Sequence, residues 1–428
     1  MSRAVRRIGL LHHVGGGNLG DEATVETVAR NIRQRWPKAE IVALSMNPDD
    51  TEARHGVKSY PLRRMRWSIG YRPAGPESAF KKKLKVLARK CKASYPLAMA
   101  RLPSEALREL SFLMSSRHKV KSLDLLIICG GGQLTGRDGP WGFPYTLFKW
   151  IALARSAGVR CIFLNVGAGP LTTPLSKFFA RRALHGADYV SFRDNKSQAL
   201  VREIGFTGKS WVFPDKVYSL EFAAINTAPP DKGSRRTVGL APMPYPDHGG
   251  APTENDQILY NEFIGKLASF GSWLASQSYA LEFFGTDIGV DPKAIDDLQK
   301  TLQFQQALCP SRNGTRRPVQ SVHDLLATMS RVDYVVTCRF HGVVFAHLLN
   351  KPVLAIAHHP KVAELMSDLE LSSYCVDIRN FDPDLLAERF ASMVVRTEEI
   401  KARMAASLTT NRQLLRRQFD ELFGLEVS

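Results

Sequence analysis

The sequence of 428 residues is poor in cysteine, and none of its cysteines form a C-x-x-C pair. Several of the six lie in apolar, strand-like segments, which is typical of reduced core thiols in a cytosolic protein. This distribution argues against a zinc site. The cysteines are Cys91, Cys129, Cys161, Cys309, Cys338 and Cys375.

Long apolar runs are also missing, because no stretch approaches the ~20 consecutive apolar residues of a membrane span. The basic N-terminal residues precede only a short apolar run, which His12 and His13 interrupt. That run is too short for the apolar region of a signal peptide, and a first strand explains it better. We therefore expect a cytoplasmic protein.

Acidic residues are scarce relative to basic ones, with 41 Asp and Glu against 58 Lys and Arg, a net charge of +17. The imbalance is concentrated between Tyr60 and Ser122, where 16 Lys and Arg face 3 Asp and Glu. From about Ser78 a basic amphipathic helix is predicted in this insert, in which lysines surround Phe80 and Leu84. Three interpretations remain open: peripheral contact with an anionic membrane at its inner face, contact with an acidic partner, or the solvated face of a helical hairpin. We see no nucleic-acid motif around the charge and expect no nucleic-acid partner.

The chain is longer than a single domain of ~150 residues, so we expect more than one hydrophobic core. Its 44% of hydrophobic residues is typical of a globular protein. Alternating strands and helices predict an α/β fold of two doubly wound, Rossmann-like domains. We place the first domain at residues 1–222, with the basic helical insert at about 60–122. A polar linker follows at 223–236, then a second domain at 237–380 and a C-terminal helical tail at 381–428.

The most informative stretch runs from Val332 to Lys361. A strand over 332–337, a helix over 342–349 and a strand over 352–357 form a β-α-β unit with almost no spare residues. Arg339, His341 and Lys361 follow the carboxyl ends of these strands, where ligands bind in open parallel sheets. Arg339 offers a planar guanidinium, Lys361 a compact charge and His341 an imidazole, all near the N-terminus of the predicted helix. Together these groups predict a small anion site. The alternative is an ordinary polar surface turn.

The loop after the first strand is rich in glycine. Gly15, Gly17 and Gly20 have the G-x-G-x-x-G spacing of a dinucleotide fingerprint. Its acidic partner would have to be Asp49 or Asp50, which we place late, in a loop.

Asn18, Asp21 and Glu22 at the start of the helix predicted from about 22 to 36 also disfavour a pyrophosphate. We therefore rank the dinucleotide interpretation of this loop low. Asp21 and Glu22 either cap this helix or hold and deprotonate sugar hydroxyls.

Two further strand ends carry candidate binding groups. The strand predicted over 123–129 ends in three glycines that include Gly131 and Gly132, so backbone must approach something closely there. Arg193 ends the strand predicted over 189–193 and precedes Asp194. An anion ligand and a structural partner of Asp194 are both open interpretations of Arg193.

These motifs occur in the order typical of a known family, which the chain resembles over nearly its whole length: the polysaccharide pyruvyl transferases. The basic insert is the part that does not match the family pattern. The resemblance implies a GT-B-like fold with two Rossmann-like domains facing a cleft. The motifs are G-N-x-G-D-E at 17–22, the triple glycine, V-G-A-G-P at 166–170, S-F-R-D at 191–194, P-D at 214–215, R-F-H-G at 339–342 and Lys361.

The resemblance further implies transfer of the pyruvyl group of phosphoenolpyruvate onto two hydroxyls of a sugar. The products are a cyclic ketal and phosphate, and the acceptor is a polysaccharide or a lipid-linked oligosaccharide. Phosphoenolpyruvate is then a donor substrate. The scheme needs no cofactor and no metal, because side-chain cations stabilise the negative charges of the reaction. His341 would be the acid, and Asp21 or Glu22 would act on the sugar hydroxyl. The substrate-binding candidates are Arg339, Lys361, Arg193, Gly17, Asn18, Gly131 and Gly132.

Two other functions stay open from the residues alone. A GT-B glycosyltransferase with a nucleotide-sugar donor would share the fold and the basic helix start. A non-catalytic scaffold at a membrane surface would use the basic insert, but the intact Arg339, His341 and Lys361 argue against it.

Overall fold

The computed structural model describes residues 6–64, 94–222, 235–246, 253–304 and 319–424, without the side chains of 94–106. The basic helix predicted from Ser78 and most of the linker predicted at 223–236 lie outside the described residues. The chain divides into two compact units. Unit 1 comprises residues 1–16 and 32–213, and unit 2 comprises residues 17–31 and 214–428.

Unit 1 is built on a seven-stranded parallel sheet, sheet 1, in the order β3-β2-β1-β4-β5-β6-β7. The strand order reverses between β1 and β4, which both pair in parallel with their neighbours, so the edge beyond them is a topological switch point. The strands are β1 (Arg7–Leu11), β2 (Glu40–Ser45), β3 (Lys58–Pro61), β4 (Leu125–Ile128), β5 (Arg160–Val166), β6 (Tyr189–Phe192) and β7 (Trp211–Val212).

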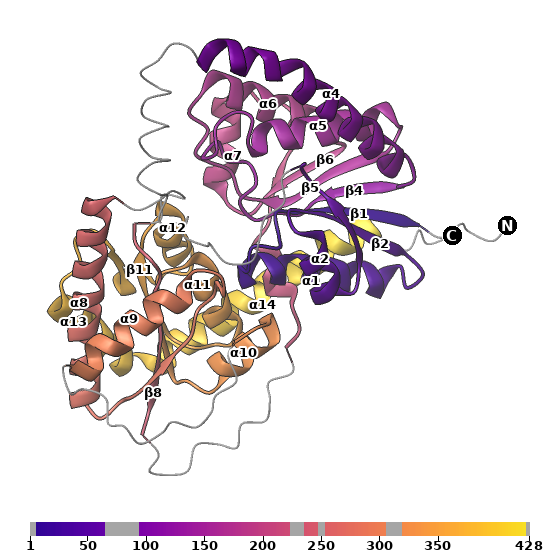
Figure 1. Cartoon of the computed structure of the whole chain (residues 1–428). Coiled ribbons are helices and arrows are strands. Elements are labelled where there is room, and N and C mark those ends of the chain that lie inside the picture. The colour runs from indigo at the N-terminus through magenta and orange to yellow at the C-terminus, as the bar shows by residue number, and fades with distance from the viewer. Residues whose placement is uncertain (1–5, 65–93, 223–234, 247–252, 305–318, 425–428) are drawn as a thin grey trace. The chain divides into compact units, whose positions relative to one another are not determined.

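Helices cover both faces of sheet 1 (Figure 1). Buried Trp150, Phe163 and Phe192 belong to the hydrophobic core of this unit. The indole N–H of Trp150 donates to the carbonyl of Leu62 at 2.9 Å, so the large ring is buried without losing its hydrogen bond. The helices are α2 (Pro48–His55), α4 (Ser94–Lys121), α5 (Phe143–Ser156), α6 (Pro174–His185) and α7 (Asn195–Glu203), together with the last turn of α1 (Leu19–Arg35).

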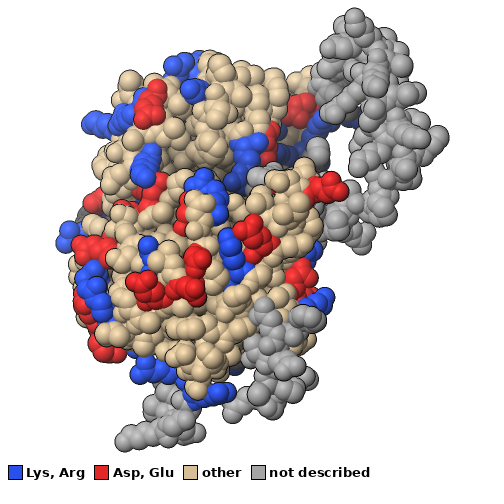
Figure 2. Space-filling view, turned by 90° about the vertical axis from the view of Figure 1, so that its left-hand side faces the viewer, with Lys and Arg blue, Asp and Glu red and all other residues tan. Residues whose placement is uncertain are grey.

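Unit 2 contains a five-stranded parallel sheet, sheet 2, in the order β12-β11-β10-β8-β9. The face of unit 2 that is visible in Figure 2 mixes acidic and basic side chains. The strands are β8 (Thr237–Ala241), β9 (Ala280–Phe283), β10 (Tyr334–Thr337), β11 (Val353–Ala357) and β12 (Cys375–Asp377). The helices are α8 (Glu254–Ser276), α9 (Asp291–Phe304), α10 (Val322–Ser330), α11 (Phe340–Leu348), α12 (Pro360–Asp368), α13 (Pro383–Val395) and α14 (Thr397–Phe423), with 3-10 turns η1 (Lys216–Ser219) and η2 (Ser372–Tyr374).

Most predicted elements are present, and the differences have local causes. The loop predicted around Asp49 and Asp50 is wrong, because Asn47 caps α2 there and accepts the N–H of Asp50. The short strands β3 and β12 and the helix α12 were not predicted, and the predicted tail is two helices, α13 and α14. In the part of the chain that the structure describes, no helix combines the length and apolarity needed to cross a bilayer.

Candidate functional site

Arg339 immediately precedes α11, at the carboxyl edge of sheet 2. The buried carboxylate of Asp291 holds its guanidinium: Nη2 lies 2.6 Å from Oδ1, and Nε lies 2.9 Å from Oδ1 and 3.1 Å from Oδ2. Asp291 Oδ2 also accepts the backbone N–H groups of Thr286 at 3.0 Å and Asp287 at 2.9 Å. Burial raises the pKa of Asp291, and Arg339 and these N–H groups oppose the rise. Arg339 is thus a cation whose position is fixed before any ligand binds.

Asp287 provides a second carboxyl at this edge, in the turn between β9 and α9. Burial raises its pKa to about 6; the nearby Arg339 cation opposes that rise, whereas the charges of Asp291 and Asp21 add to it. Its Oδ1 accepts the N–H of Gly289 at 2.9 Å, which holds the side chain in place. A carboxyl that titrates near pH 6 can take up or release a proton under neutral conditions.

His341 lies in the first turn of α11 and is 8% exposed. Its ring packs against the backbone of Gly20, where an added Cβ would lie 2.0 Å from Nδ1 and 2.1 Å from Cγ. Only glycine fits at position 20 for this reason. His341 Nε2 lies 3.9 Å from Oδ2 of Asp215, which is longer than a hydrogen bond but close enough for a carboxylate to stabilise an imidazolium. Asp215 is itself fixed, because its Oδ1 accepts the N–H of Val217 at 3.0 Å.

The G-N-x-G-D-E turn at 17–22 belongs to unit 2 and is bound to the edge of sheet 2 by backbone hydrogen bonds. The N–H of Leu19 donates to the carbonyl of Thr286 at 2.8 Å, and the N–H of Ile288 donates to the carbonyl of Gly17 at 2.9 Å. This explains how a turn near the start of the chain reaches Arg339 and His341.

Asn18 caps the helix that this turn begins. Its Oδ1 accepts the N–H of Gly20 at 3.0 Å and that of Asp21 at 3.4 Å, and its backbone forms an antiparallel bridge with Asp287. The helix therefore starts at 19 rather than near 22, and Asn18 rather than Asp21 or Glu22 is the cap. Asp21 and the buried Glu22 lie in the first turn.

The second strand end of the predicted β-α-β unit carries Lys361 in the first turn of α12. His359 caps this helix, since its Nδ1 accepts the N–H of Lys361 at 3.3 Å. His358 Nδ1 lies 2.7 Å from the carbonyl oxygen of Cys338, so this nitrogen carries the proton and donates it. Burial lowers the pKa of His358 to about 4, and the cations of Lys361 and Arg339 contribute to the lowering. His358 is consequently neutral at pH 7.

The remaining predicted site residues lie in unit 1. The carbonyl of Gly131 accepts the N–H of Gly167 at 2.9 Å, whereas a Cβ at Gly132 would have no described atom within 4 Å. Arg193 Nε lies 3.4 Å from Oδ2 of Asp194. Gly167 makes room for this pair, because a Cβ there would lie 2.8 Å from Arg193 Nε. The structure thus shows Arg193 as a partner of Asp194, and its role as an anion ligand stays a prediction.

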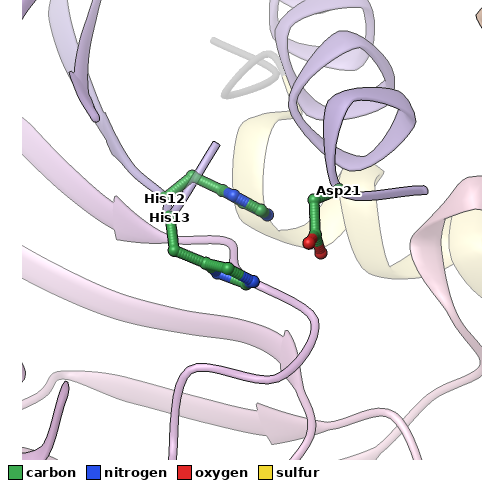
Figure 3. A group of neighbouring side chains, drawn as sticks. All are labelled: His12, His13 and Asp21. Atoms are coloured by element: carbon green, nitrogen blue, oxygen red, sulfur yellow. The ribbon is translucent and has the colours of Figure 1, made fainter. Parts of the chain in front are cut away.

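A second group of polar rings in unit 1 was not predicted as a site. His12 and His13 follow β1, and their rings stack with centroids 4.7 Å apart (Figure 3). His13 meets Phe143 edge-on at 5.5 Å, and the Arg63 guanidinium lies 4.3 Å from the Phe143 ring centre. Burial lowers the pKa of Arg63. Figure 3 also shows Asp21, in the first turn of α1.

Sequence reasoning missed three carboxyls of unit 2 as site residues: Asp215, Asp287 and Asp291. Two of them had a signal, because Asp215 belongs to the P-D motif at 214–215 and Asp287 closely follows the apolar segment that forms β9. Asp291 had none, since its partner Arg339 is 48 positions away in the chain.

The fold matches that of solved sugar-processing enzymes. The UDP-GlcNAc 2-epimerase from Neisseria meningitidis, bound to UDP-GlcNAc, has a TM-score of 0.52 at 12% identity, over 93% of this chain and 94% of its own. A glycosyltransferase from Rickettsia africae ESF-5 has a TM-score of 0.52 at 12% identity, over 99% of this chain and 100% of its own. Likeness at this identity shows the fold alone. The protein has a two-domain α/β fold of the GT-B class, as predicted.

Sequence comparison identifies the family within this class. The model of the family described as "Polysaccharide pyruvyl transferase" matches residues 18–360, most of the chain. The chain belongs to the polysaccharide pyruvyl transferase family, which confirms the family predicted from its motifs, and it is a transferase. No protein with a curated description matches the sequence.

Proposed function

We propose that this protein transfers the pyruvyl group of phosphoenolpyruvate to two hydroxyls of a saccharide, forming a cyclic ketal and releasing phosphate. The observation that supports this most is the carboxyl edge of sheet 2. There Arg339, Lys361 and the N-termini of α11 and α12 lie beside His341, all within unit 2. A three-carbon donor with a carboxylate and a phosphate suits such a small cationic edge.

The donor would be held by charge that is already in place. Arg339 is fixed by Asp291 and offers planar N–H donors suited to a carboxylate or phosphate, while Lys361 supplies a point charge. Arg193 of unit 1 is a further candidate anion ligand. Neutral His358 adds a polar group without adding charge.

His341 is our candidate acid. In the reaction a proton is added to the methylene carbon of the donor, and the first sugar oxygen bonds to the central carbon. The second sugar oxygen then displaces phosphate from that carbon. An imidazolium suits the first step, and Asp215 at 3.9 Å stabilises this form of His341.

The acceptor hydroxyls also need a proton acceptor. Of their two protons, one replaces the proton given to the methylene carbon and the other leaves with phosphate, so the enzyme returns to its starting state. We assign this step to Asp287, whose pKa is about 6, with Asp21 orienting the hydroxyl. Buried Glu22 supports the turn, and Gly17 and Asn18 are candidates to line the acceptor site. Gly131 and Gly132 of unit 1 stay candidate substrate-binding residues.

The test is an assay of the purified protein with phosphoenolpyruvate and a panel of saccharides, in which phosphate release and the ketal methyl signal are both measured. His341→Ala is expected to abolish both products while its thermal melting stays near that of the wild type. Arg339→Lys keeps the positive charge opposite Asp291 but loses the planar guanidinium that can make two parallel hydrogen bonds. KM for phosphoenolpyruvate should therefore rise about tenfold or more.

Thermal shift with ligands separates this proposal from its alternatives. Stabilisation by phosphoenolpyruvate and not by nucleotide sugars is the expected result. Stabilisation by a nucleotide sugar alone would support a GT-B glycosyltransferase instead. Near-normal turnover by His341→Ala would remove His341 from the mechanism.

A further inference from the structure

One layer of unit 1 is unusually basic. α4 packs beside α5, and α5 beside α6, over one face of sheet 1 (Figure 1). The described side chains of these helices, at 107–121, 143–156 and 174–185, include nine Lys and Arg and a single acidic residue, Glu109. Glu109 is already paired, with Arg64 at 3.1 Å and with Lys149 at 2.9 Å. The layer therefore presents positive charge that the described helices do not balance.

The same layer exposes large apolar side chains. Among the described residues of unit 1, only Trp211 is an exposed large apolar residue outside these helices and the turn that leads into α5. Three of its members, at positions i, i+3 and i+7 of α4, form one stripe along that helix. The six members are Leu107, Leu110, Met114, Trp141, Leu175 and Phe178, and the first and third are both 67% exposed.

The exposed rings are held from below. Trp141, which is 66% exposed, lies 5.2 Å from the ring of Tyr145 and 5.6 Å from that of Phe179. Phe178 contacts Phe148 with ring centres 6.5 Å apart. These contacts fix the rings at the surface instead of letting them fold back into the core, so their exposure is a feature of the packed unit.

We propose that this layer, the basic helical face, docks on the surface of an anionic lipid bilayer. Its charge complements acidic headgroups, and leucine, methionine and aromatic side chains can insert between them. Its exposed basic residues are Arg108, Arg117, Lys121, Arg155, Lys177 and Arg182.

Other partners suit the basic helical face less well. A nucleic acid would satisfy the charge but not the aliphatic stripe. Unit 2 contrasts with this layer, since its visible face mixes both signs of charge (Figure 2). The proposal concerns where the enzyme works and does not depend on the identity of its donor.

The test is co-sedimentation of the full chain with phosphatidylcholine vesicles, with and without phosphatidylserine. We expect binding only with phosphatidylserine, and a decrease as salt is raised. The double variant Leu107→Ser/Met114→Ser should weaken binding about tenfold or more. Lys177→Gln/Arg182→Gln should weaken it most at low salt.

The matched control is Leu385→Ser/Val395→Ser, which changes two exposed apolar residues of α13 in unit 2 and should bind like the wild type. Thermal melting checks that every variant is folded, and turnover of a water-soluble acceptor should be unchanged in all of them. Equal binding to both kinds of vesicle, or full binding by the Leu107/Met114 variant, overturns the proposal. Binding to a DNA duplex without binding to vesicles would also overturn it. The same holds if the wild type is a dimer that only the Leu107→Ser/Met114→Ser variant dissociates.

Discussion

Asp287 and Asp291 of unit 2 lie near the guanidinium of Arg339, and Asp21 lies near Asp287. The charges of these groups decide which carboxyl can move a proton. Asp291 makes the direct ion pair with Arg339 and accepts two backbone N–H groups. Asp287 is close enough to feel the cation but also the two other carboxyls. The negative charge of these carboxyls is therefore least compensated at Asp287, which makes Asp287 a better proton acceptor than Asp291.

Asp287→Asn tests this assignment. The pKa of Asp287, about 6, lies above the usual value of a carboxyl, so the folded protein binds its proton more tightly than the unfolded chain. Stability is therefore lost as pH rises from about 4 to 6, and the amide of the variant, which does not titrate, should avoid this loss. We expect the variant to lose about 100-fold or more in kcat and to be at least as stable as the wild type at pH 7.

The pH profile supplies the second measurement. Wild-type kcat/KM should rise as pH increases through about 6, because the acceptor must be deprotonated, and Asp287→Asn should lack this limb. Asp384→Asn, at an exposed position of α13, is the control and should keep the wild-type profile. A limb near pH 6 that persists in Asp287→Asn would assign the titration to another group.

At the scale of elements, α11 connects the site to the rest of unit 2. All nine of its residues are buried. At one end it carries His341, and at the other His347 joins two separate elements. His347 Nε2 donates to the carbonyl of Met404 in α14 at 2.8 Å, and Nδ1 accepts from the hydroxyl of Tyr218 in η1 at 3.0 Å. His341 and the N-terminal N–H groups of α11 thus belong to a helix whose other end is fixed by the two hydrogen bonds of His347.

His347→Ala should lower the free energy of unfolding by about 2–4 kcal/mol at pH 7, because it removes two buried hydrogen bonds and leaves a cavity. Burial lowers the pKa of His347 to about 4. Its stabilisation is therefore complete above about pH 6.5 and is lost as pH falls towards 4.

Urea unfolding at pH 7 and pH 5 measures both effects of His347→Ala. The gap between wild type and variant should narrow at pH 5. His323→Ala, at an exposed position of α10, should change stability by less than about 0.5 kcal/mol. An equal gap at both pH values would contradict the assignment of a neutral, buried His347.

At the scale of the whole molecule, residues 17–31 belong to the same compact unit as residues 214–428. The N-terminal turn is therefore part of the site around Arg339 and His341, although most of the chain separates them. Its contact with His341 depends on the missing side chain of Gly20.

Gly20→Ala places a methyl group within 2.0 Å of His341 Nδ1, so either the ring or the turn must move. We expect a loss of activity comparable to that of His341→Ala, while most of the fold is retained. Gly265→Ala is the control, because a Cβ there meets no described atom within 4 Å and alanine favours a helix. Full activity in Gly20→Ala would show that this contact is not needed.

The sequence predicted several strands to within a few residues, including β4, β6 and β11, because apolar runs of four to seven residues are local signals. It also predicted that Arg339, His341 and Lys361 follow strand ends. It failed at α2, where the capping residue Asn47 starts a helix without an apolar pattern. It also failed at α12, a short helix that His359 caps directly after a strand. The edge strands β3 and β12 are too short to show the alternation of apolar and polar residues that is typical of a strand.

The sequence by itself determined most of the order of strands and helices, the positive charge of the insert and the family to which the chain belongs. These depend on periodicity, composition and motif order along the chain. Only the tertiary structure decided the partners: Asp291 for Arg339, Asp215 for His341 and Gly20 against the imidazole ring. Those contacts join distant parts of the chain, and the energy of a buried charge depends on every group packed around it.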